Sequence, residues 1–430
     1  MRKGNYRYVI VARDRKSVAA RGWIFEVGLN MKWVKKICVA ALFFISLCIW
    51  FFPLFCVESA FADDISADDK AEAEEKLNEN IQDLIDNLDL QALQDYVDSL
   101  DEFDDGSVGE RLLDQIKGEA FDYDGFWARI ADVLFEDVWN LLPAFACIAA
   151  VTLLSGLISS LRSGSTARTS ADVIFLITYV AALIPLIGVL TECFRAAMDS
   201  VSSMREQMQI VYPLLLTLMA ASGGSVSVAV CRPAVSFFST AIVSIIDGVV
   251  FPLTITIIAF SMASNLTKEL KISKFSAFFK SINKWIIGVC VSVFGIFFTV
   301  QGITATTYDG VVRRAAKYAI GNGIPIVGGF LSGGYDLAVA GSVLIKNSLG
   351  SMSIFMMVSV IFEPIVLLIA INLALRFTAA ITQPFGDSRI SDFLGETADN
   401  LHYCTAGLLF TAFLYFLSIV VIVSSSEALL

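Results

Sequence analysis

The sequence contains a succession of apolar segments, several of them as long as a membrane-crossing helix. After residue 140 they cover 141–161, 173–190, 210–221, 234–246, 249–263, 285–303, 353–375 and 404–423. A helix needs about 20 apolar residues to cross the hydrocarbon of a bilayer. Hydrophobic residues make up 56% of the chain and charged residues 17%, far from the mixture of a soluble domain. The sequence therefore predicts an all-α, polytopic membrane protein whose multi-span domain covers residues 141–430.

The stretch 234–263 is the ambiguous part of this pattern, because Asp247 and Gly248 divide it. Two short re-entrant arms, two packed spans, or one span with an unusually long approach would each account for it.

The amino-terminal part resembles a secretory signal peptide over residues 31–62. Met31 opens a basic stretch, an apolar run follows, and Ala60 and Ala62 provide the small side chains of a cleavage site before Asp63. An uncleaved anchor is the alternative, because the apolar run is long for a signal core. Residues 1–30 precede a complete signal peptide, so we interpret them as an upstream extension and expect translation to begin at Met31.

Residues 63–140 form an acidic region. Between Asp63 and Asp137 there are 25 acidic and five basic residues, which gives this region a net charge of −20. Since the whole chain has a net charge of −11, the remaining residues together carry +9. Apolar residues recur there at helical spacing, which predicts amphipathic helices outside the cell. The stretch DEFDDGSVGE lacks the ligands of a calcium-binding loop, because Phe103 and Leu112 occupy two ligand positions.

The basic residues predict the orientation of the spans. The loop with Arg162 and Arg168 and the lysine-rich stretch 265–284 are both expected in the cytoplasm. The apolar stripe of the second stretch predicts a helix lying along the inner membrane surface.

No pattern of catalysis, cofactor binding or metal binding is present. The single histidine, His402, has no Ser, Cys or Asp at a catalytic spacing and is interpreted as an interfacial polar residue. The eight cysteines show no metal or redox spacing. No dense Lys/Arg stripe with interleaved aromatics points to nucleic acid. The sequence therefore predicts a protein that is not an enzyme and has no cofactor.

Two carboxylates lie within apolar segments, and charge in lipid is expensive. Glu363, directly before Pro364, and Asp247 are candidates for a transport pathway. The alternative, which we favour, is that Glu363 is protonated or paired near a proline kink and that Asp247 caps a turn.

The stretch GNGIPIVGGFLSGGYD, residues 321–336, gathers helix-breaking residues between two apolar segments. Broken backbone at membrane depth is tolerated only where protein or a water-filled cavity satisfies it. We therefore expect a broken segment that is either a hinge outside the membrane or a re-entrant segment along a pathway. The candidate pathway or packing residues are Pro325, Gly328, Gly329, Gly333, Gly334, Lys346 and Asn347.

The block AAKYAIGNGIPIVGGFLSGGYDLAVAGSVLIKNSLG resembles the most distinctive part of the stage III sporulation protein AE family of endospore-forming bacteria. The likeness extends over nearly the whole chain from Met31. It implies a multi-pass protein in the mother-cell membrane around the forespore, within a channel-like complex that supports late forespore development. The implied partners are the other membrane proteins of that complex and the lipid bilayer, and a homo-oligomer stays open. The family has no assigned catalytic residues.

Two other functions stay open on the sequence. One is a secondary transporter that uses broken helices and Glu363, although the counterpart breaker at 222–233 is weak. The other is a scaffold without a pore.

Overall fold

A computed structural model describes residues 67–100, 106–117, 139–154, 168–266, 274–297, 328–384 and 388–424. Every regular element in these ranges is helical, and they contain no strand. Five of the described helices are long and apolar enough to cross a membrane, whereas Trp139–Leu154 is shorter. The five are Phe175–Ala221, Ser227–Leu266, Lys274–Phe297, Leu337–Thr382 and Arg389–Ser424. The predicted all-α polytopic membrane class is confirmed.

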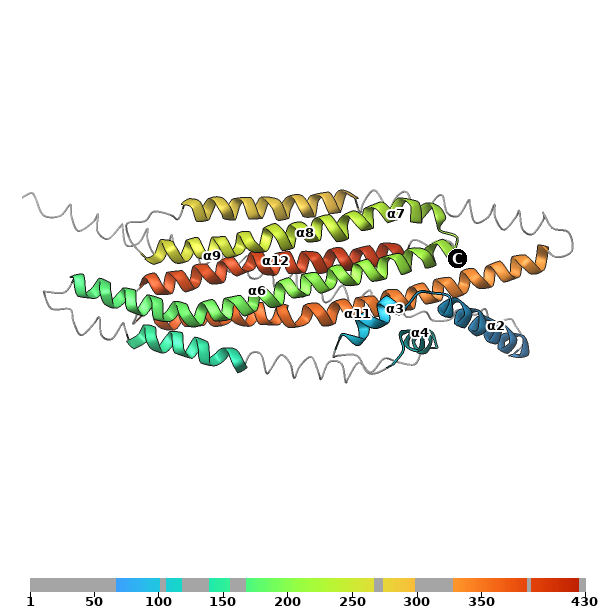
Figure 1. Ribbon diagram of the computed structural model, residues 1–430, viewed down its shortest axis with the longest axis horizontal. Coiled ribbons are helices and arrows are strands. Elements are labelled where there is room, and N and C mark those ends of the chain that lie inside the picture. The colour runs from blue at the N-terminus through green and yellow to red at the C-terminus, as the bar shows by residue number, and fades with distance from the viewer. Residues whose placement is uncertain are drawn as a thin grey trace, which may run out of the picture. The chain divides into compact units, whose positions relative to one another are not determined.

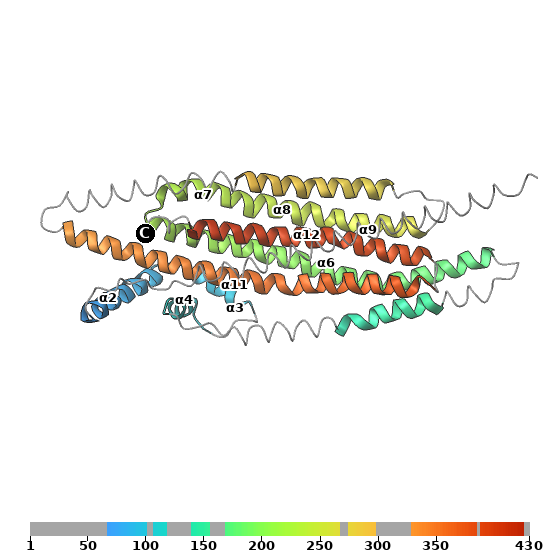
Figure 2. The ribbon, with the colours of Figure 1, turned by 180° about the vertical axis from the view of Figure 1, so that it is seen from behind.

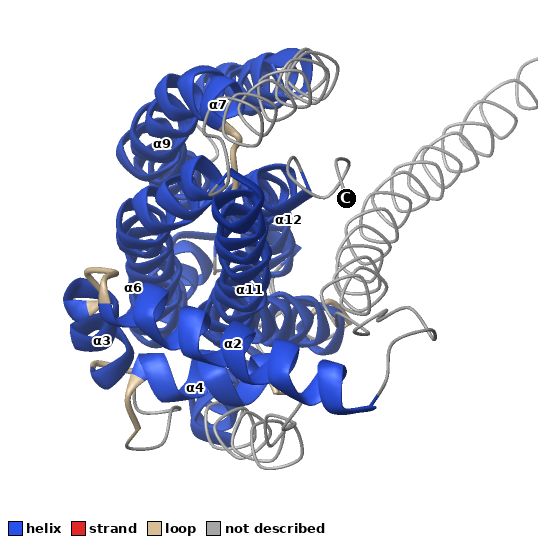
Figure 3. Ribbon diagram, turned by 90° about the vertical axis from the view of Figure 1, so that its right-hand side faces the viewer, coloured by secondary structure: helices blue, strands red, loops and turns tan. Residues whose placement is uncertain are grey.

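Three long helices form the centre of the bundle: α6 (Arg168–Ala221), α11 (Gly328–Thr382) and α12 (Ser388–Ser424). They run alongside one another (Figures 1 and 2), with α11 packed against both α6 and α12. The view along the helices in Figure 3 shows α9 on the side of this group away from α2 and α4. Helix α12 is enclosed by its neighbours, because it exposes none of its large apolar side chains.

Helix α6 corrects one sequence expectation. The segments 173–190 and 210–221, expected as separate, belong to one helix of 54 residues that contains Pro185 and Pro213. Charged residues between them, such as Glu192, Arg195 and Glu206, interrupt the hydropathy but not the backbone hydrogen bonding, because they are good helix formers at exposed positions.

The ambiguous stretch 234–263 lies within one uninterrupted helical run from Ser225 to Leu266. This run consists of α7 (Ser225–Phe237), η1 (Phe238–Ile242), α8 (Val243–Ile245), η2 (Ile246–Val250) and α9 (Phe251–Leu266), where η marks a π-helical turn. Of the three arrangements, a single span with a long approach matches this run. Two re-entrant arms do not.

The helix Lys274–Phe297 packs against the preceding one. Phe260 of α9 stacks on Phe279, with ring centroids 5.4 Å apart, and Asn283 Nδ2 donates to Thr254 Oγ1 at 2.9 Å. Residues 274–284 are thus the first turns of this helix and not a separate surface helix, which corrects the interfacial expectation for that part. Residues 267–273 lie outside the described residues.

The acidic region contributes α2 (Ala67–Asp86), α3 (Gln91–Asp98) and α4 (Val108–Ile116). Each is amphipathic as predicted. The buried apolar face includes Ile81 in α2, Leu93 in α3 and Leu112 in α4. The side chain of Ser107 accepts from the Glu110 N–H at 3.2 Å, so Ser107 is the amino-terminal cap of α4. The stretch DEFDDGSVGE, in which a calcium-binding loop was rejected, therefore contains the start of this helix. Helices α2 and α4 pack against α11, and α3 packs against α6.

Candidate functional site

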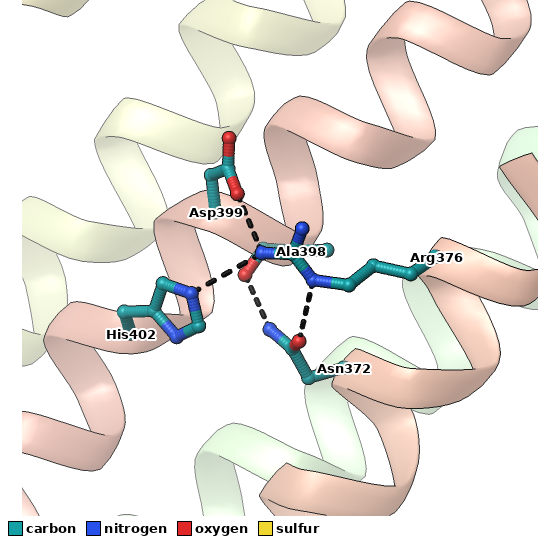
Figure 4. Close-up of polar contacts among 5 residues, drawn as sticks. All are labelled: Asn372, Arg376, Ala398, Asp399 and His402. Carbon is teal, nitrogen blue, oxygen red and sulfur yellow. Dashed lines mark hydrogen bonds and ion pairs between the residues drawn. The ribbon is translucent and has the colours of Figure 1, made fainter. Parts of the chain in front are cut away.

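A polar cluster joins α11 to α12 within otherwise apolar helices (Figure 4). The guanidinium of Arg376 lies at its centre, with its Nη2 2.6 Å from Asp399 Oδ1 and 3.3 Å from His402 Nε2. The Nε of Arg376 donates to Asn372 Oδ1 at 2.9 Å, and Asn372 Nδ2 donates to the carbonyl oxygen of Ala398 at 2.5 Å. One guanidinium therefore binds groups from both helices.

Helix geometry explains why these residues meet. Asn372 and Arg376 are four residues apart on α11, and Asp399 and His402 are three apart on α12, so each pair lies on one helix face. The short connection between the two helices makes them antiparallel neighbours, which brings the two faces together. Arg376 and Asp399 keep 32% and 34% of their side-chain surface accessible. The cluster is thus half-buried.

The protonation states follow from the donors and acceptors. A guanidinium carries only donors and stays charged, so its contact with His402 is a hydrogen bond when the imidazole Nε2 carries no proton. Asp399, as the carboxylate, compensates the charge of Arg376 through a charge-assisted hydrogen bond. The arrangement is suited to holding two helices together in a weakly polar setting. No group of three His, Cys, Asp or Glu residues in the described ranges could hold a metal ion.

The first half of α12 makes two further polar contacts, with different helices. The carboxylate of Glu396 accepts from the Ser261 hydroxyl and, at 3.2 Å, from Asn265 Nδ2, both on α9. The guanidinium of Arg389 lies 3.3 Å from the centroid of the Phe175 ring on α6. The amino-terminal half of α12 is therefore linked by polar or cationic side chains to α6, α9 and α11.

Of the residues proposed from the sequence, Lys346 and Asn347 have the clearest structural setting. Both lie on α11 and are buried, with 0% and 2% of their surface exposed. The Nζ of Lys346 donates to the carbonyl oxygen of Val423 at 2.6 Å, in the last turn of α12. A carbonyl in the last turn has no partner within its own helix. Lys346 therefore fastens the end of α12 to α11.

The two carboxylates proposed within spans have different surroundings. Asp247 lies in the π-helical turn η2 and is 3.5 Å from Arg205 of α6. Its expected role as a turn cap is therefore replaced by an ion pair inside a continuous helical run. Glu363 is exposed on α11, whose helix continues through Pro364.

The glycine residues proposed at the broken segment fall at the start of α11. Gly328, Gly329, Gly333 and Gly334 are helical, so the break expected over 321–336 does not extend across residues 328–336. Pro325 and the rest of 321–327 lie outside the described residues. So do the cleavage residues Ala60, Ala62 and Asp63, and the signal peptide stays a prediction.

The Arg376 cluster was not proposed from the sequence, although His402 was noted as polar. The signals were an arginine within the apolar stretch INLALRFTAA and the spacing of Asp399 and His402 on one helix face. Which helices pack together could not be known from that spacing.

The comparisons with known proteins identify the family. Residues 108–426, about three quarters of the chain, match the family described as Stage III sporulation protein AE. The chain belongs to the stage III sporulation protein AE family. It is also 25% identical over 317 residues to the Stage III sporulation protein AE of Bacillus subtilis (strain 168), a match that covers 74% of this chain and 79% of that protein. No solved structure matches the chain.

Membership in this family gives the chain a role in sporulation, and the five apolar helices make it a multi-pass membrane protein. The matched region contains α4 and the later described helices, including the Arg376 cluster and Lys346. The family's description names a stage of spore formation and no reaction, in agreement with a sequence that shows no catalytic pattern.

Proposed function

We propose that the protein is the membrane-embedded part of a multiprotein, channel-like complex between mother cell and forespore. The observation that carries the proposal is that a membrane protein, with five long apolar helices among its described residues, belongs to a stage III sporulation family. The partners are the other membrane proteins of the stage III complex. The protein supports forespore development after engulfment.

The helical bundle supports a role in assembly. The polar contacts of the central helices join one helix to another, as at Arg376–Asp399 and at Lys346–Val423. Rigid packing of this kind is what a component needs if it is to hold partners in fixed positions. The secondary transporter receives less support, because α11 is continuous from Gly328 to Thr382 and Glu363 lies on its exposed side.

We further propose that residues 63–140 lie outside the cytoplasm after cleavage before Asp63. The acidic composition and the basic residues at 162–168 and 265–284 support this orientation. Amino-terminal sequencing of the protein purified from membranes should give Asp63 as the first residue. An intact Met31 or Met1 end would show an anchored leader instead.

The function is tested by deleting the gene in its endospore-forming host. Engulfment should proceed, while reporters of late forespore gene expression should fall to the background level, and the intact gene should restore them. In the same host, an affinity-tagged protein cross-linked during sporulation should purify with other stage III membrane proteins. Normal spore yield in the deletant would contradict the sporulation role. Purification of the protein alone would contradict its place in a complex.

A further inference from the structure

The exposed apolar side chains of the two longest helices stop abruptly at one level. On α6 the exposed large apolar residues run from Val173 to Ile187, and the next exposed charged residue is Glu192. On α11 they run from Phe377 back to Ile369, after which Glu363 is exposed. Neither helix exposes a large apolar side chain beyond these two glutamates among the residues whose burial is described.

The two changes lie at neighbouring heights in the bundle. The hydroxyl of Ser200 on α6 donates to the carbonyl oxygen of Val360 on α11. Ser200 lies eight residues beyond Glu192 and Val360 three residues beyond Glu363, so the two changes differ in height by about 8 Å. From Arg168 to Glu192 a helix rises about 36 Å, and from Glu363 to Thr382 about 29 Å. The hydrocarbon of a bilayer is about 30 Å thick. The segments that contain the exposed apolar side chains are therefore each about as long as a bilayer is thick, although the helices are much longer.

The acidic helices contact α6 and α11 beyond this level. Gln207 of α6 donates to Tyr96 Oη of α3 at 2.9 Å and to the carbonyl oxygen of Met356 on α11 at 3.2 Å. Gln115 of α4 donates to Ser351 of α11. Since Asp95 and Asp98 on the same α3 helix are exposed, hydrocarbon at this height would surround carboxylates, which is very costly.

We infer that lipid covers α6 and α11 only up to Glu192 and Glu363, and that the remaining parts of these two helices, with the carboxyl-terminal part of α12, project into water as a stalk. On α6 and α11 the lipid-facing surface consists of the exposed apolar side chains named above. The stalk contains α6 from Glu192 to Ala221, α11 from the start of the helix to Glu363, and the docked helices α2 to α4.

With this placement, the most apolar part of α12 is surrounded by protein and not by lipid. Residues 404–423 were expected to form a membrane span, but none of their large apolar side chains is more than partly exposed. Tyr415, Phe416 and Ile419 are buried within the bundle, with at most 1% exposed. In the stalk these residues form the hydrophobic core of a structure surrounded by water.

Charged groups within the apolar layer have routes to stability. Arg376 and Asp399 pair with each other. The exposed carboxylate of Glu396 accepts from Ser261 and Asn265 of α9. The flexible side chains of Lys280 and Lys284 can extend along the protein toward the layer's edge.

On the side of α7 and helix 274–297 the apolar surface extends further. Val230 and Phe237 on α7 are exposed, and Phe238, next to Phe237, packs on Phe294 of helix 274–297, where Ile296 is 67% exposed.

The basic residues give the side on which the stalk lies. Arg168, Lys274 and Arg389 lie at the beginnings of helices at the end of the bundle opposite the stalk. Since positive residues near span ends favour the cytoplasm, the stalk projects to the extracytoplasmic side. This inference rests on the described helices and not on the proposed complex.

The test places single nitroxide labels on full-length protein in phospholipid nanodiscs. The native cysteines are first replaced by alanine, in a variant that accumulates in membranes at the level of the unsubstituted protein. Ile184 and Leu373, 70% and 68% exposed, are labelled as layer positions, and Ser202 and Glu206, both exposed on α6, as stalk positions. Labels at Ile184 and Leu373 should relax more with oxygen, which concentrates in lipid. Labels at Ser202 and Glu206 should relax more with a water-soluble nickel complex.

Oxygen-dominated relaxation at Ser202 and Glu206 would overturn the inference, because lipid would then reach the proposed stalk. In sporulating cells, Ile184→Lys should reduce the membrane-inserted protein severalfold, whereas Ser202→Lys should leave its level unchanged. Equal loss of both variants would also contradict the placement. A deletion strain that sporulates normally would not affect these outcomes, so the two proposals fail separately.

Discussion

At the scale of the residue, Arg376 holds the two central antiparallel helices together through several acceptors at once. It binds Asn372 on its own helix and Asp399 and His402 on the next. A half-buried charge is costly when its partner is removed, because the remaining charge cannot be fully hydrated. The cluster should therefore behave as one unit in mutational tests.

Single substitutions of the ion pair should each be destabilising. We expect Arg376→Gln and Asp399→Asn each to lower the free energy of unfolding by about 1.5–3 kcal/mol, the usual range for hydrogen bonds to charged groups. The double variant should lose less stability than the two single variants together, because with both side chains neutral no unpaired charge remains in the cluster. Thermal unfolding of the detergent-solubilised protein measures this coupling. Strictly additive losses would show that the two side chains do not interact in solution.

The second prediction at this scale concerns the half-buried imidazole. Replacing His402 by Gln keeps a side-chain oxygen that can accept from Arg376, whereas His402→Lys places a second positive charge beside it. The Gln variant should retain near-normal protein levels, and the Lys variant should be clearly less stable. Equal levels of both in sporulating membranes would argue that the imidazole does not face the guanidinium.

At the scale of the element, close packing of α12 depends on a glycine. A Cβ at Gly407 would lie 3.2 Å from both Ile246 Cγ2 and Phe251 Cε1, and these two neighbours are fully buried. The absence of a side chain therefore lets α12 approach the run formed by η2 and α9. Small residues serve the same purpose at many contacts between membrane helices.

Filling this contact should loosen the bundle. We expect Gly407→Leu to cost about 1–3 kcal/mol, typical of overpacking in a close-packed interior. Gly395→Leu is the matched control on the same helix, since a Cβ there meets no atom within 4 Å. Leu is a better helix former than Gly, so a loss at Gly407 alone must come from packing. Similar unfolding temperatures for the two variants would show that α12 is not seated as described.

At the scale of the whole molecule, the acidic helices are docked on the bundle and are not a loose appendage. The junction at Gln207 joins α3, α6 and α11. Another contact lies at Gly341 of α11, where a Cβ would come within 3.1 Å of Asn80 Oδ1 and 3.2 Å of Leu84 Cδ1 on α2. Both contacts lie in the proposed stalk.

Blocking the second contact should release α2. In Gly341→Leu we expect the region around 67–86 to be cleaved severalfold faster by a protease, because a detached amphipathic helix is only marginally stable in water. Gly188→Leu, at a position where a Cβ meets nothing within 4 Å, should be cleaved at the rate of the unsubstituted protein. Limited proteolysis of the purified protein decides it. Unchanged cleavage of Gly341→Leu would mean that α2 does not dock there.

Local sequence patterns were sufficient to predict several elements. The helical spacing of Ile81, Leu93 and their neighbours predicted the amphipathic helices, because such helices must bury one face. Lys346 and Asn347 were singled out as polar interruptions of an apolar segment, and both are buried in the structure. The extent of α6 was not predicted, because exposed polar residues lower hydropathy without ending a helix.

The sequence by itself determined the class of the protein, its family and the apolar character of its helices. Those properties depend on composition and short-range spacing, which hydropathy and motif comparison read directly. Only the tertiary structure decided that Arg376 meets Asp399, and that residues 404–423 are enclosed by protein. The physical reason is that hydropathy measures the cost of exposing a side chain to water. Lipid and a protein core relieve that cost almost equally, so only the neighbours of a helix show which of the two surrounds it.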